Sequence, residues 1–322
     1  MLQRKSILLV VVIALVGVLT ILGNSTPNGG KTNGEANGSL SGCPLLQYQG
    51  FPAGVEPLGV FDGAEVYGTD NGYVLRIENS TYSLNASSVF FFNWGFVVIE
   101  NASEMGSVPF VKFSVDPYGR TNVSTGRLTS KVPVVVLRAC TYDGKLLWNL
   151  TFSGYAWAYD GGKYGVKANG TALPALLVTN TSDYLYVLAY QTASRPYSEF
   201  RNYASDDYFY VLGRNGTVRK FNLERGFVPI RNVFLVSNGS YVLLGFERPQ
   251  PDGSPMSGYV MIMNGAEVVW NRTFQMKYPD CLCHVISGWG RIDKKGCAVF
   301  GLYTGEGRYC NGKFSHVANT TG

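Results

Sequence analysis

Two cysteines and a histidine lie close together in the stretch CLCH, at Cys281, Cys283 and His284. Covalent haem attachment requires two residues between the cysteines, and this stretch has one. A zinc site completed by Cys297 would have suitable ligand types. In an exported chain these thiols are more often consumed by disulfides. We therefore expect disulfides here, with no bound metal and no other cofactor.

Hydrolytic chemistry would need other residues, and the chain offers few of them. The two histidines, His284 and His316, lie outside any G-x-S-x-G or H-E-x-x-H motif. A glycosidase needs only two carboxylates about 5–10 Å apart. The acidic residues that could supply such a pair are Asp116, Asp160, Asp206, Asp207 and Glu247. Aspartate beside glycine or proline usually belongs to a turn, so we assign no catalytic residue and keep a hydrolase as an alternative.

Recognition chemistry is concentrated in residues 191–207, QTASRPYSEFRNYASDD, which contain no N-x-S/T sequon. Tyrosine and arginine provide contact area and directional hydrogen bonds at modest entropic cost, and both are enriched in binding surfaces. We predict a ligand-binding loop whose contacts are Arg195, Tyr197, Phe200, Arg201 and Tyr203. The alternative is that these aromatic side chains only cover the edges of strands.

Thirteen asparagines stand in N-x-S/T with x not proline, several times the number that the serine and threonine content would produce by chance. Such an excess indicates a secreted or surface glycoprotein. The alternative is a chain that is merely rich in Asn, Ser and Thr turns. The sequons begin at Asn24, Asn37, Asn79, Asn85, Asn101, Asn122, Asn149, Asn169, Asn180, Asn215, Asn238, Asn271 and Asn319.

Six cysteines, an even number, are consistent with three disulfides in an oxidising compartment. Fifteen pairings are conceivable, and the sequence does not choose among them. Four of the six, Cys281, Cys283, Cys297 and Cys310, follow residue 280. We expect local disulfides in this C-terminal segment, and we expect Cys43 and Cys140 either to pair with each other or to join that cluster.

An apolar segment opens the chain. Residues 7–23 contain only one polar residue, Thr20, and follow Arg4 and Lys5. As a helix rising ~1.5 Å per residue, this segment would be roughly 26 Å long, close to the ~30 Å hydrocarbon core of a bilayer. We interpret residues 1–23 as a signal anchor that contacts the membrane, with a cleaved signal peptide as the alternative. In either case the rest of the chain is expected outside the cell.

Residues 24–43 are mostly Gly, Asn, Ser and Thr, with almost nothing to bury. We expect a flexible linker of ~25 Å root-mean-square span, followed by an extracellular domain over residues 44–322. The net charge of +5 is spread over 27 basic and 22 acidic residues. Nucleic-acid binding is not expected, because it requires basic residues gathered on one face.

Short apolar runs bounded by Gly, Asn, Asp or Pro follow one another along this domain, and helical periodicity is absent. Examples are VPVVVLRA, YLYVLAY, YFYVLG, YVLLGF and YVMIM. Asn-Gly and Asp-Gly pairs between the runs supply the positive φ angles of tight hairpins. The sequence therefore predicts an all-β fold of consecutive antiparallel hairpins.

One hairpin layout recurs in VVVLRACTYDGKLLWNLTF, YFYVLGRNGTVRKFNL and YVMIMNGAEVVWNRTF, and more weakly in YVLRIENSTYSL. Each strong copy has an apolar strand, a turn that ends in glycine, and a second strand with an aromatic residue. The glycines are Gly144, Gly216 and Gly265, and the aromatic residues are Trp148, Phe221 and Trp270. Repeated β-sheets with loop insertions of variable length produce such a pattern.

The turn DGKLLW, which starts at Asp143, resembles the D-G-x-L-x-W hairpin that ends each blade of a PQQ-like β-propeller, and AEVYGTDNGYVLRI resembles two strands of such a blade. The resemblance implies about five blades of antiparallel strands, without implying a quinone cofactor. We place them near residues 55–84, 88–153, 155–223, 228–274 and 281–315, with closure shared by the two ends. Tandem β-sandwich domains are the alternative. Dense sequons and many tyrosines also resemble archaeal extracellular glycoproteins in style.

Extra length is expected between the second and third strands of three blades, in residues 101–131, 191–207 and 248–258. In a propeller these loops emerge on one face. We therefore expect a membrane-tethered, glycosylated surface or envelope protein that binds a protein or glycan through that face. The alternatives are a secreted carbohydrate-active hydrolase and a self-assembling envelope or filament subunit.

Overall fold

The computed structural model consists almost entirely of β-strands wherever its residues are described. The described residues are 42–48, 56–70, 72–86, 88–118, 121–162, 167–173, 175–190, 208–223, 230–248, 257–275, 288–302 and 305–317. The chain divides into Met1–Gly42 and a compact unit, Cys43–Gly322, which contains all of these strands. The all-β prediction is confirmed, whereas the helix expected in residues 1–23 lies outside the described residues. Within the described ranges, no helix has the length and apolarity needed to cross a membrane.

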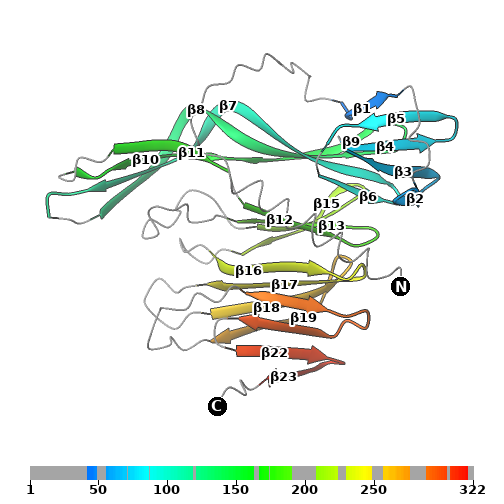
Figure 1. The fold of residues 1–322 in the computed structure, drawn as a ribbon. Helices are drawn as coiled ribbons and strands as arrows, with labels where there is room; N and C mark the ends of the chain where they lie inside the picture. Colours follow the sequence, from blue (N-terminus) through cyan, green and yellow to red (C-terminus); the bar gives the residue numbers. More distant parts are fainter. Residues whose placement is uncertain are drawn as a thin grey trace. The chain divides into compact units, whose positions relative to one another are not determined.

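The strands form five sheets, which we name A to E in chain order (Figure 1). Sheet A has the order β1-β5-β4-β3-β2 and contains β1 (Leu45–Gln47), β2 (Gly59–Phe61), β3 (Ala64–Thr69), β4 (Gly72–Ile77) and β5 (Ser80–Leu84). Sheet B contains β6 (Val89–Phe92), β7 (Gly95–Val115), β8 (Thr121–Cys140), β9 (Leu146–Ser153), β10 (Tyr155–Asp160) and β11 (Lys167–Ala172).

Sheets C, D and E are four-stranded antiparallel meanders in which each strand pairs with the next along the chain. Sheet C contains β12 (Ala175–Asn180), β13 (Leu185–Tyr190), β14 (Tyr208–Gly213) and β15 (Gly216–Asn222). Sheet D contains β16 (Arg231–Ser237), β17 (Tyr241–Arg248), β18 (Ser257–Asn264) and β19 (Glu267–Gln275). Sheet E contains β20 (Trp289–Ile292), β21 (Ala298–Leu302), β22 (Gly305–Cys310) and β23 (Lys313–Val317).

The same meander of four strands is present in sheet B as β6 to β9 and in sheet A as β2 to β5. The predicted hairpins are therefore the third and fourth strands of successive sheets. Their turn glycines have the expected positive φ angles, which are 85° at Gly144, 96° at Gly216 and 55° at Gly265. Glycine is required here because L side chains rarely adopt this backbone conformation.

The expected boundary of the third unit, at residue 155, is wrong. β10 and β11 belong to sheet B, because β10 pairs in parallel with the outer part of β7, from Ala156↔Phe110 to Asp160↔Ser114. The chain crosses from the β9 side of the hairpin to the β7 side at Gly154, whose N–H donates to the Pro133 carbonyl at 2.9 Å. Sheet C then begins at residue 175. A strand pairing across 46 residues of sequence leaves no local signal.

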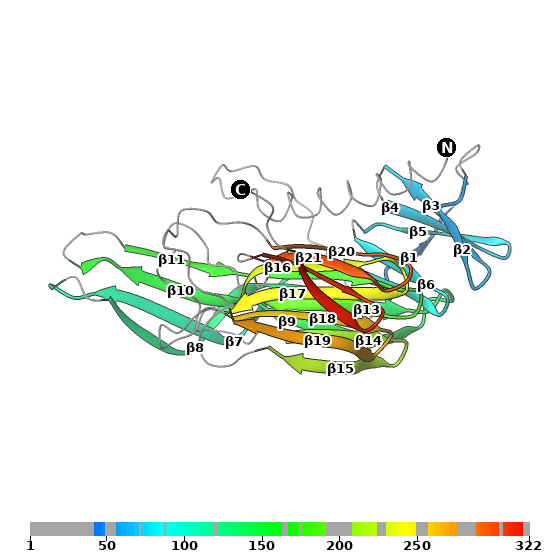
Figure 2. The same cartoon turned by 90° about the horizontal axis from the view of Figure 1, so that it is seen from below.

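The segment 101–131 was expected as a loop, and this expectation is also wrong. β7 and β8 remain paired from Phe96↔Cys140 to Val115↔Thr121, so the inserted residues lengthen the two strands. We call the outer part of this hairpin, residues 101–133, together with β10 and β11, the arm. In both views the arm continues past the strand ends of sheets C, D and E (Figures 1 and 2). β-Forming Val, Phe and Thr residues at these positions support strand extension.

Four apolar clusters connect consecutive sheets: A with B, B with C, C with D, and D with E. Sheets B, C and D each contribute to two clusters, so their central strands are buried on both faces. The strand β13, for example, is buried from Leu185 to Ala189. This explains why the central strands are continuous apolar runs in the sequence, whereas the edge strand β15 is mostly exposed. We call the parts of β6–β9 that lie outside the arm, together with sheets C, D and E, the stack.

The recurring aromatic residue of the fourth strand packs against the next sheet. Trp148 of sheet B belongs to the cluster with sheet C, and its indole N–H donates to the Gly213 carbonyl at 2.9 Å. Phe221 belongs to the cluster between sheets C and D. Trp270 belongs to the cluster between sheets D and E, with its ring centre 4.5 Å from that of Tyr309. The repeat in the sequence is therefore a repeat of contacts between sheets.

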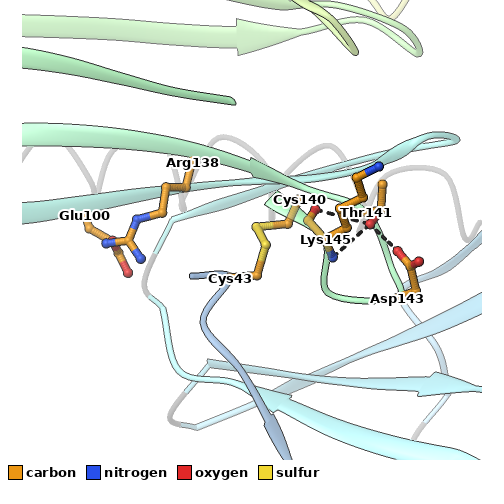
Figure 3. Close-up of a disulfide and its surroundings, with 7 residues drawn as sticks. All are labelled: Cys43, Glu100, Arg138, Cys140, Thr141, Asp143 and Lys145. Carbon is orange, nitrogen blue, oxygen red and sulfur yellow. Dashed lines mark hydrogen bonds and ion pairs between the residues drawn. A yellow bond between two sulfur atoms is a disulfide. The ribbon is translucent and has the colours of Figure 1, made fainter. Parts of the chain in front are cut away.

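Two disulfides lie among the described residues. Cys297–Cys310 is local, with 13 residues of separation, and Cys43–Cys140 spans 97 residues with a Cα–Cα distance of 6.0 Å. Both were among the pairings expected, and Cys281 and Cys283 lie outside the described residues. Cys43–Cys140 joins the start of sheet A to the end of β8 (Figure 3). The first sheet is thus held covalently to the second.

A buried ion pair lies two residues before this disulfide on β8. Arg138, whose side chain is 8% exposed, pairs with the carboxylate of Glu100 on β7 (Figure 3). A buried charge that loses its partner is strongly destabilising. The pair therefore favours the observed register of β7 on β8 over a shifted one.

The expected closure through both chain ends is not found in the described residues, because β1 pairs with β5 of sheet A and sheet E is built from residues 289–317. Within the same residues, no apolar cluster joins sheet A to sheet E. The propeller therefore stays a prediction.

Candidate binding surface

In an antiparallel meander the first and third turns lie at one end of the sheet, and the connection between the second and third strands lies at the other. Hydrogen bonds join turns and strand starts of neighbouring sheets at the first of these ends. They are Trp94 Nε1 to the Asp183 carbonyl (3.2 Å), Tyr186 Oη to the Gly265 carbonyl (2.9 Å) and Asn238 Nδ2 to the Asp293 carbonyl. Sheets B to E therefore share one orientation, and we call this end the turn end.

The opposite end of sheets B to D, which we call the insertion end, receives all three insertions. The arm extends β7 and β8, residues 191–207 connect β13 to β14, and residues 249–256 connect β17 to β18. Two of these insertions lie between the second and third strands of their meanders, as predicted, whereas residues 101–131 lengthen those two strands in sheet B. Sheets A and E have no comparable insertion, since β3 and β4 are separated by two residues and so are β21 and β22. The extra length is therefore gathered on three adjacent sheets.

The five predicted contacts, Arg195, Tyr197, Phe200, Arg201 and Tyr203, lie outside the described residues. The strands that flank their loop are described, and they end at Tyr190 and begin again at Tyr208. The root of the predicted loop is thus fixed on two central strands of sheet C.

A cation stacks on aromatic rings at this root, a feature that the sequence reasoning missed. Lys220 Nζ lies 3.6 Å from the ring centre of Tyr208 and 5.3 Å from that of Tyr210. On sheet D, Arg272 similarly lies 5.6 Å from the ring centre of Phe274. Both cations are exposed. Tyr210 pairs with Lys220 across the hairpin of β14 and β15, so the register of this hairpin brings Lys220 to the tyrosines. That register includes a β-bulge at Val211, which the sequence does not reveal.

The tip of the arm exposes a tyrosine that sequence reasoning also missed. Tyr118 is 82% exposed, and its backbone N–H donates to Asp116 Oδ1 at 2.9 Å. An exposed aromatic side chain on an ordered turn is typical of recognition surfaces. The sequence signal for it was the Asp-Pro-Tyr-Gly turn at residues 116–119.

A buried carboxylate lies at the insertion end of sheet D. Glu247 is completely buried on β17, and its carboxylate accepts a hydrogen bond from Asn232 Nδ2. Asn232 has a φ of 47° and lies where the register of β16 on β17 shifts. Such irregular, polar positions inside a sheet occur more often near functional sites than in ordinary strands.

The acidic residues considered for hydrolysis occupy three different elements. Asp116 caps the turn of the arm, as described above. Asp160 ends β10, where its Oδ1 accepts from the Gly162 N–H at 3.1 Å and its Oδ2 lies 3.7 Å from Lys167 Nζ. Glu247 is in sheet D, and Asp206 and Asp207 lie outside the described residues. Asp116 and Asp160 thus have the turn roles expected of aspartate beside proline or glycine.

The zinc alternative loses one of its four ligands, because Cys297 is bonded to Cys310. Its other members, Cys281, Cys283 and His284, are not described. In the described ranges, no group of three or more His, Cys, Asp or Glu side chains could hold a metal ion.

Ten of the sequon asparagines are described, and none of them is buried. Eight are exposed, while Asn180 and Asn238 are half-buried. Asn238 is engaged in its own turn, because its Oδ1 accepts from the N–H groups of Ser240 (2.9 Å) and Tyr241 (2.8 Å). Asn24, Asn37 and Asn319 lie outside the described residues.

Tyrosines at the sheet interfaces have perturbed acidity. Burial raises the pKa of Tyr186 to about 12, and burial likewise raises the pKa of Tyr142, whose hydroxyl donates to the Phe92 carbonyl at 2.8 Å. At the turn end, the Thr141 hydroxyl donates to Asp143 and lowers the pKa of that carboxyl (Figure 3). These groups stabilise the scaffold and lie away from the insertion end.

No protein-family model, no curated protein and no solved structure matches this chain.

Proposed function

We propose that this chain is a membrane-tethered, glycosylated surface or envelope protein whose insertion end binds a protein or a glycan. The observation that carries the proposal is the common orientation of sheets B, C and D. Three insertions leave adjacent sheets at one end, while the regular turns occupy the other. Composite surfaces of this kind, built from loops on a rigid scaffold, are where binding residues are usually found.

The location outside the cell is supported by several features of the chain. Two disulfides are typical of proteins that fold in an oxidising compartment. Residues 7–23 are apolar apart from Thr20 and follow two basic residues, and residues 24–43 are mostly Gly, Asn, Ser and Thr. The accessibility of the ten described sequon asparagines agrees with glycosylation.

The finer architecture that we propose is a PQQ-like propeller of five blades. Five consecutive meanders with apolar interfaces between neighbours support it. A propeller also requires sheet A to approach sheet E. Crosslinking between Arg76→Cys on the outer face of sheet A and Arg308→Cys on the outer face of sheet E tests this directly. A crosslink within one chain is expected for a closed ring, and its absence at several spacer lengths contradicts the ring.

Binding is tested with the full chain, solubilised in mild detergent, on a glycan array and in a pull-down from intact cells. The test variant is Tyr197→Ala with Arg201→Ala in the predicted loop. The matched control is Lys145→Ala with Arg214→Ala, which removes two exposed side chains at the turn end. We expect saturable binding that falls at least tenfold in the loop variant and stays unchanged in the turn variant.

Equal binding by all three proteins would contradict recognition through this loop. A second variant, Tyr118→Ala, then tests whether the tip of the arm carries the contact. If none of the proteins binds, hydrolase screening with Glu247→Gln as the control and measurement of self-assembly address the two alternative functions.

A further inference from the structure

The stack and the arm leave many strand edges open. Among the described residues, the fourth strands β9, β15, β19 and β23 pair on one side only, and β11 ends the arm in the same way. Two internal segments are also open among the described residues. Residues 100–109 of β7 lie between the parts paired with β6 and β10, and residues 121–132 of β8 lie beyond the part paired with β9. Open edges are templates for pairing with another chain.

The sequons that fall within strands follow these edges. Six described sequon asparagines are strand residues, and all six lie on an edge strand or in one of the two open segments. They are Asn101 (β7), Asn122 (β8), Asn149 (β9), Asn169 (β11), Asn180 (β12) and Asn271 (β19). The other four described sequons begin in turns or directly after a strand, at Asn79, Asn85, Asn215 and Asn238.

Strand length separates the edges that carry sequons from those that do not. The edge strands β1, β2, β6, β20 and β23 have three to five residues, and no sequon asparagine is a residue of any of them. The edge strands β9, β11, β12 and β19 have six to nine residues, and each contains one. The two remaining edges, β15 and β16, have seven residues each and are flanked by Asn215 and Asn238. Short edges need no further protection.

A glycan on an edge strand would oppose pairing by simple exclusion. Strands pair at ≈ 4.7–4.9 Å, so a second copy must bring its backbone and side chains against the glycan-bearing residue. Other proteins protect such edges with charge or proline. β9 and β12 have neither, whereas β11 contains one charged residue and β19 contains two. The edge segment of β8 has Arg127, whose side chain reaches back to the Ser107 carbonyl on β7.

We propose that the N-glycans on the long edge strands keep copies of this chain apart by blocking strand pairing between them. The inference rests on the glycosylation that is part of the proposed function. It explains why the sequons at Asn149, Asn169 and Asn271 lie on edge strands. A general coat of sugars would not need these positions. The sugars in turns have no such role.

The test compares two variants of the full chain, produced in a glycosylating host and kept in mild detergent. The edge variant, Asn149→Gln with Asn169→Gln and Asn271→Gln, removes three edge sequons, whereas the turn variant, Asn79→Gln with Asn85→Gln, removes two sequons next to β5, which pairs on both sides. Mass spectrometry of the wild-type peptides first establishes which asparagines carry glycans. Sedimentation velocity over a hundredfold concentration range then measures self-association. We expect the edge variant to associate at concentrations at least tenfold lower than the turn variant and wild type.

A second edge variant separates loss of sugar from the amide substitution. Thr151→Ala, Thr171→Ala and Thr273→Ala keep the three asparagines and remove their sequons, and this variant should associate like the first. A third variant replaces the same three asparagines by lysine, as Asn149→Lys, Asn169→Lys and Asn271→Lys. It should be monomeric, because charged side chains on an edge strand oppose pairing with another chain.

The outcomes distinguish this inference from the proposed function. If the edge sites carry glycans and the edge and turn variants associate equally, the inference is overturned, whereas the proposal of a glycoprotein stands. Absence of glycans at every site overturns both. Association of the glutamine variant without association of the threonine-site variant overturns the inference as well, because the sugar would then be irrelevant.

Discussion

The stack and the arm are built from the same antiparallel hairpins, yet they differ in what covers them. In the stack, sheets B, C and D each contribute to two apolar clusters, and these clusters contain eight to eleven buried residues. Among the described residues of the arm there is one small cluster, which includes Val108, Val132 and Ala156 and lies near the base. Two strands continue from one region into the other without a break in register.

The comparison shows that strand pairing and core formation are separable in this protein. β7 and β8 keep their hydrogen bonds for twenty residues, although only the inner part is buried between sheets. Apolar burial, at about 25 cal/mol per Å², therefore stabilises the stack far more than the arm. A scaffold that is stable at one end and sparsely covered at the other is suited to presenting a surface.

The largest effect should come from the disulfide that joins sheet A to β8, because it closes the longer of the two described disulfide loops. Replacing Cys43 and Cys140 by alanine opens a loop of 97 residues, for which chain entropy predicts a loss of about 4–5 kcal/mol. Urea unfolding followed by circular dichroism measures this loss. Replacing Cys297 and Cys310, which close a much shorter loop, should cost about 3 kcal/mol, and equal losses would contradict the entropic account.

A matched pair of tryptophans tests the difference in packing. Trp270→Ala removes a ring that contacts three aromatic side chains between sheets D and E, so we expect a loss of about 3–5 kcal/mol in unfolding free energy. Trp157→Ala on β10 of the arm should cost about 1 kcal/mol. The two values come from the same chemical denaturation experiment, and a larger loss in the arm would reverse the comparison.

The junction between the two regions depends on Gly154. A Cβ atom at this position would lie 2.4 Å from the Ala172 carbonyl oxygen and 2.6 Å from that of Pro133, and neither is a side chain that can move away. Gly154→Ala should therefore release β10 and β11 from their pairing with β7 while the stack stays folded. Hydrogen exchange should increase in residues 155–172 and remain unchanged in sheets C to E. Gly126→Ala, where the added Cβ meets open space, is the control.

The smallest effect should be a loss of stack stability at high pH. The raised pKa of Tyr186 means that the unfolded state loses its proton near pH 10 and the folded state only near pH 12. Stability is therefore complete below pH 10 and falls as pH rises towards 12. Tyr186→Phe should flatten the curve of unfolding free energy against pH. An unchanged slope would show that other groups, such as Tyr142, determine it.

Local sequence signals predicted much of the stack and little of the arm. The hairpins at Gly144, Gly216 and Gly265 have turn chemistry and strand patterns that depend on a few adjacent residues, and all three were found. The boundary at residue 155 was missed because YAWAYD is a strand by composition whichever sheet it joins. The contacts at the candidate binding surface, such as that of Lys220 with Tyr208, depend on the register across a hairpin with a β-bulge, which composition does not reveal.

By itself the sequence determined the all-β class, the repeated hairpin with its turn glycine and aromatic residue, and the positions of sequons and cysteines. These properties follow from the spacing of apolar residues, from turn chemistry and from residue type, all of which act over a few residues. Only the tertiary structure decided that residues 101–131 lengthen two strands, that β10 returns to β7, and that Cys43 bonds to Cys140. Those outcomes depend on pairings between distant segments, where many alternatives have similar local energies and packing of the whole chain selects one.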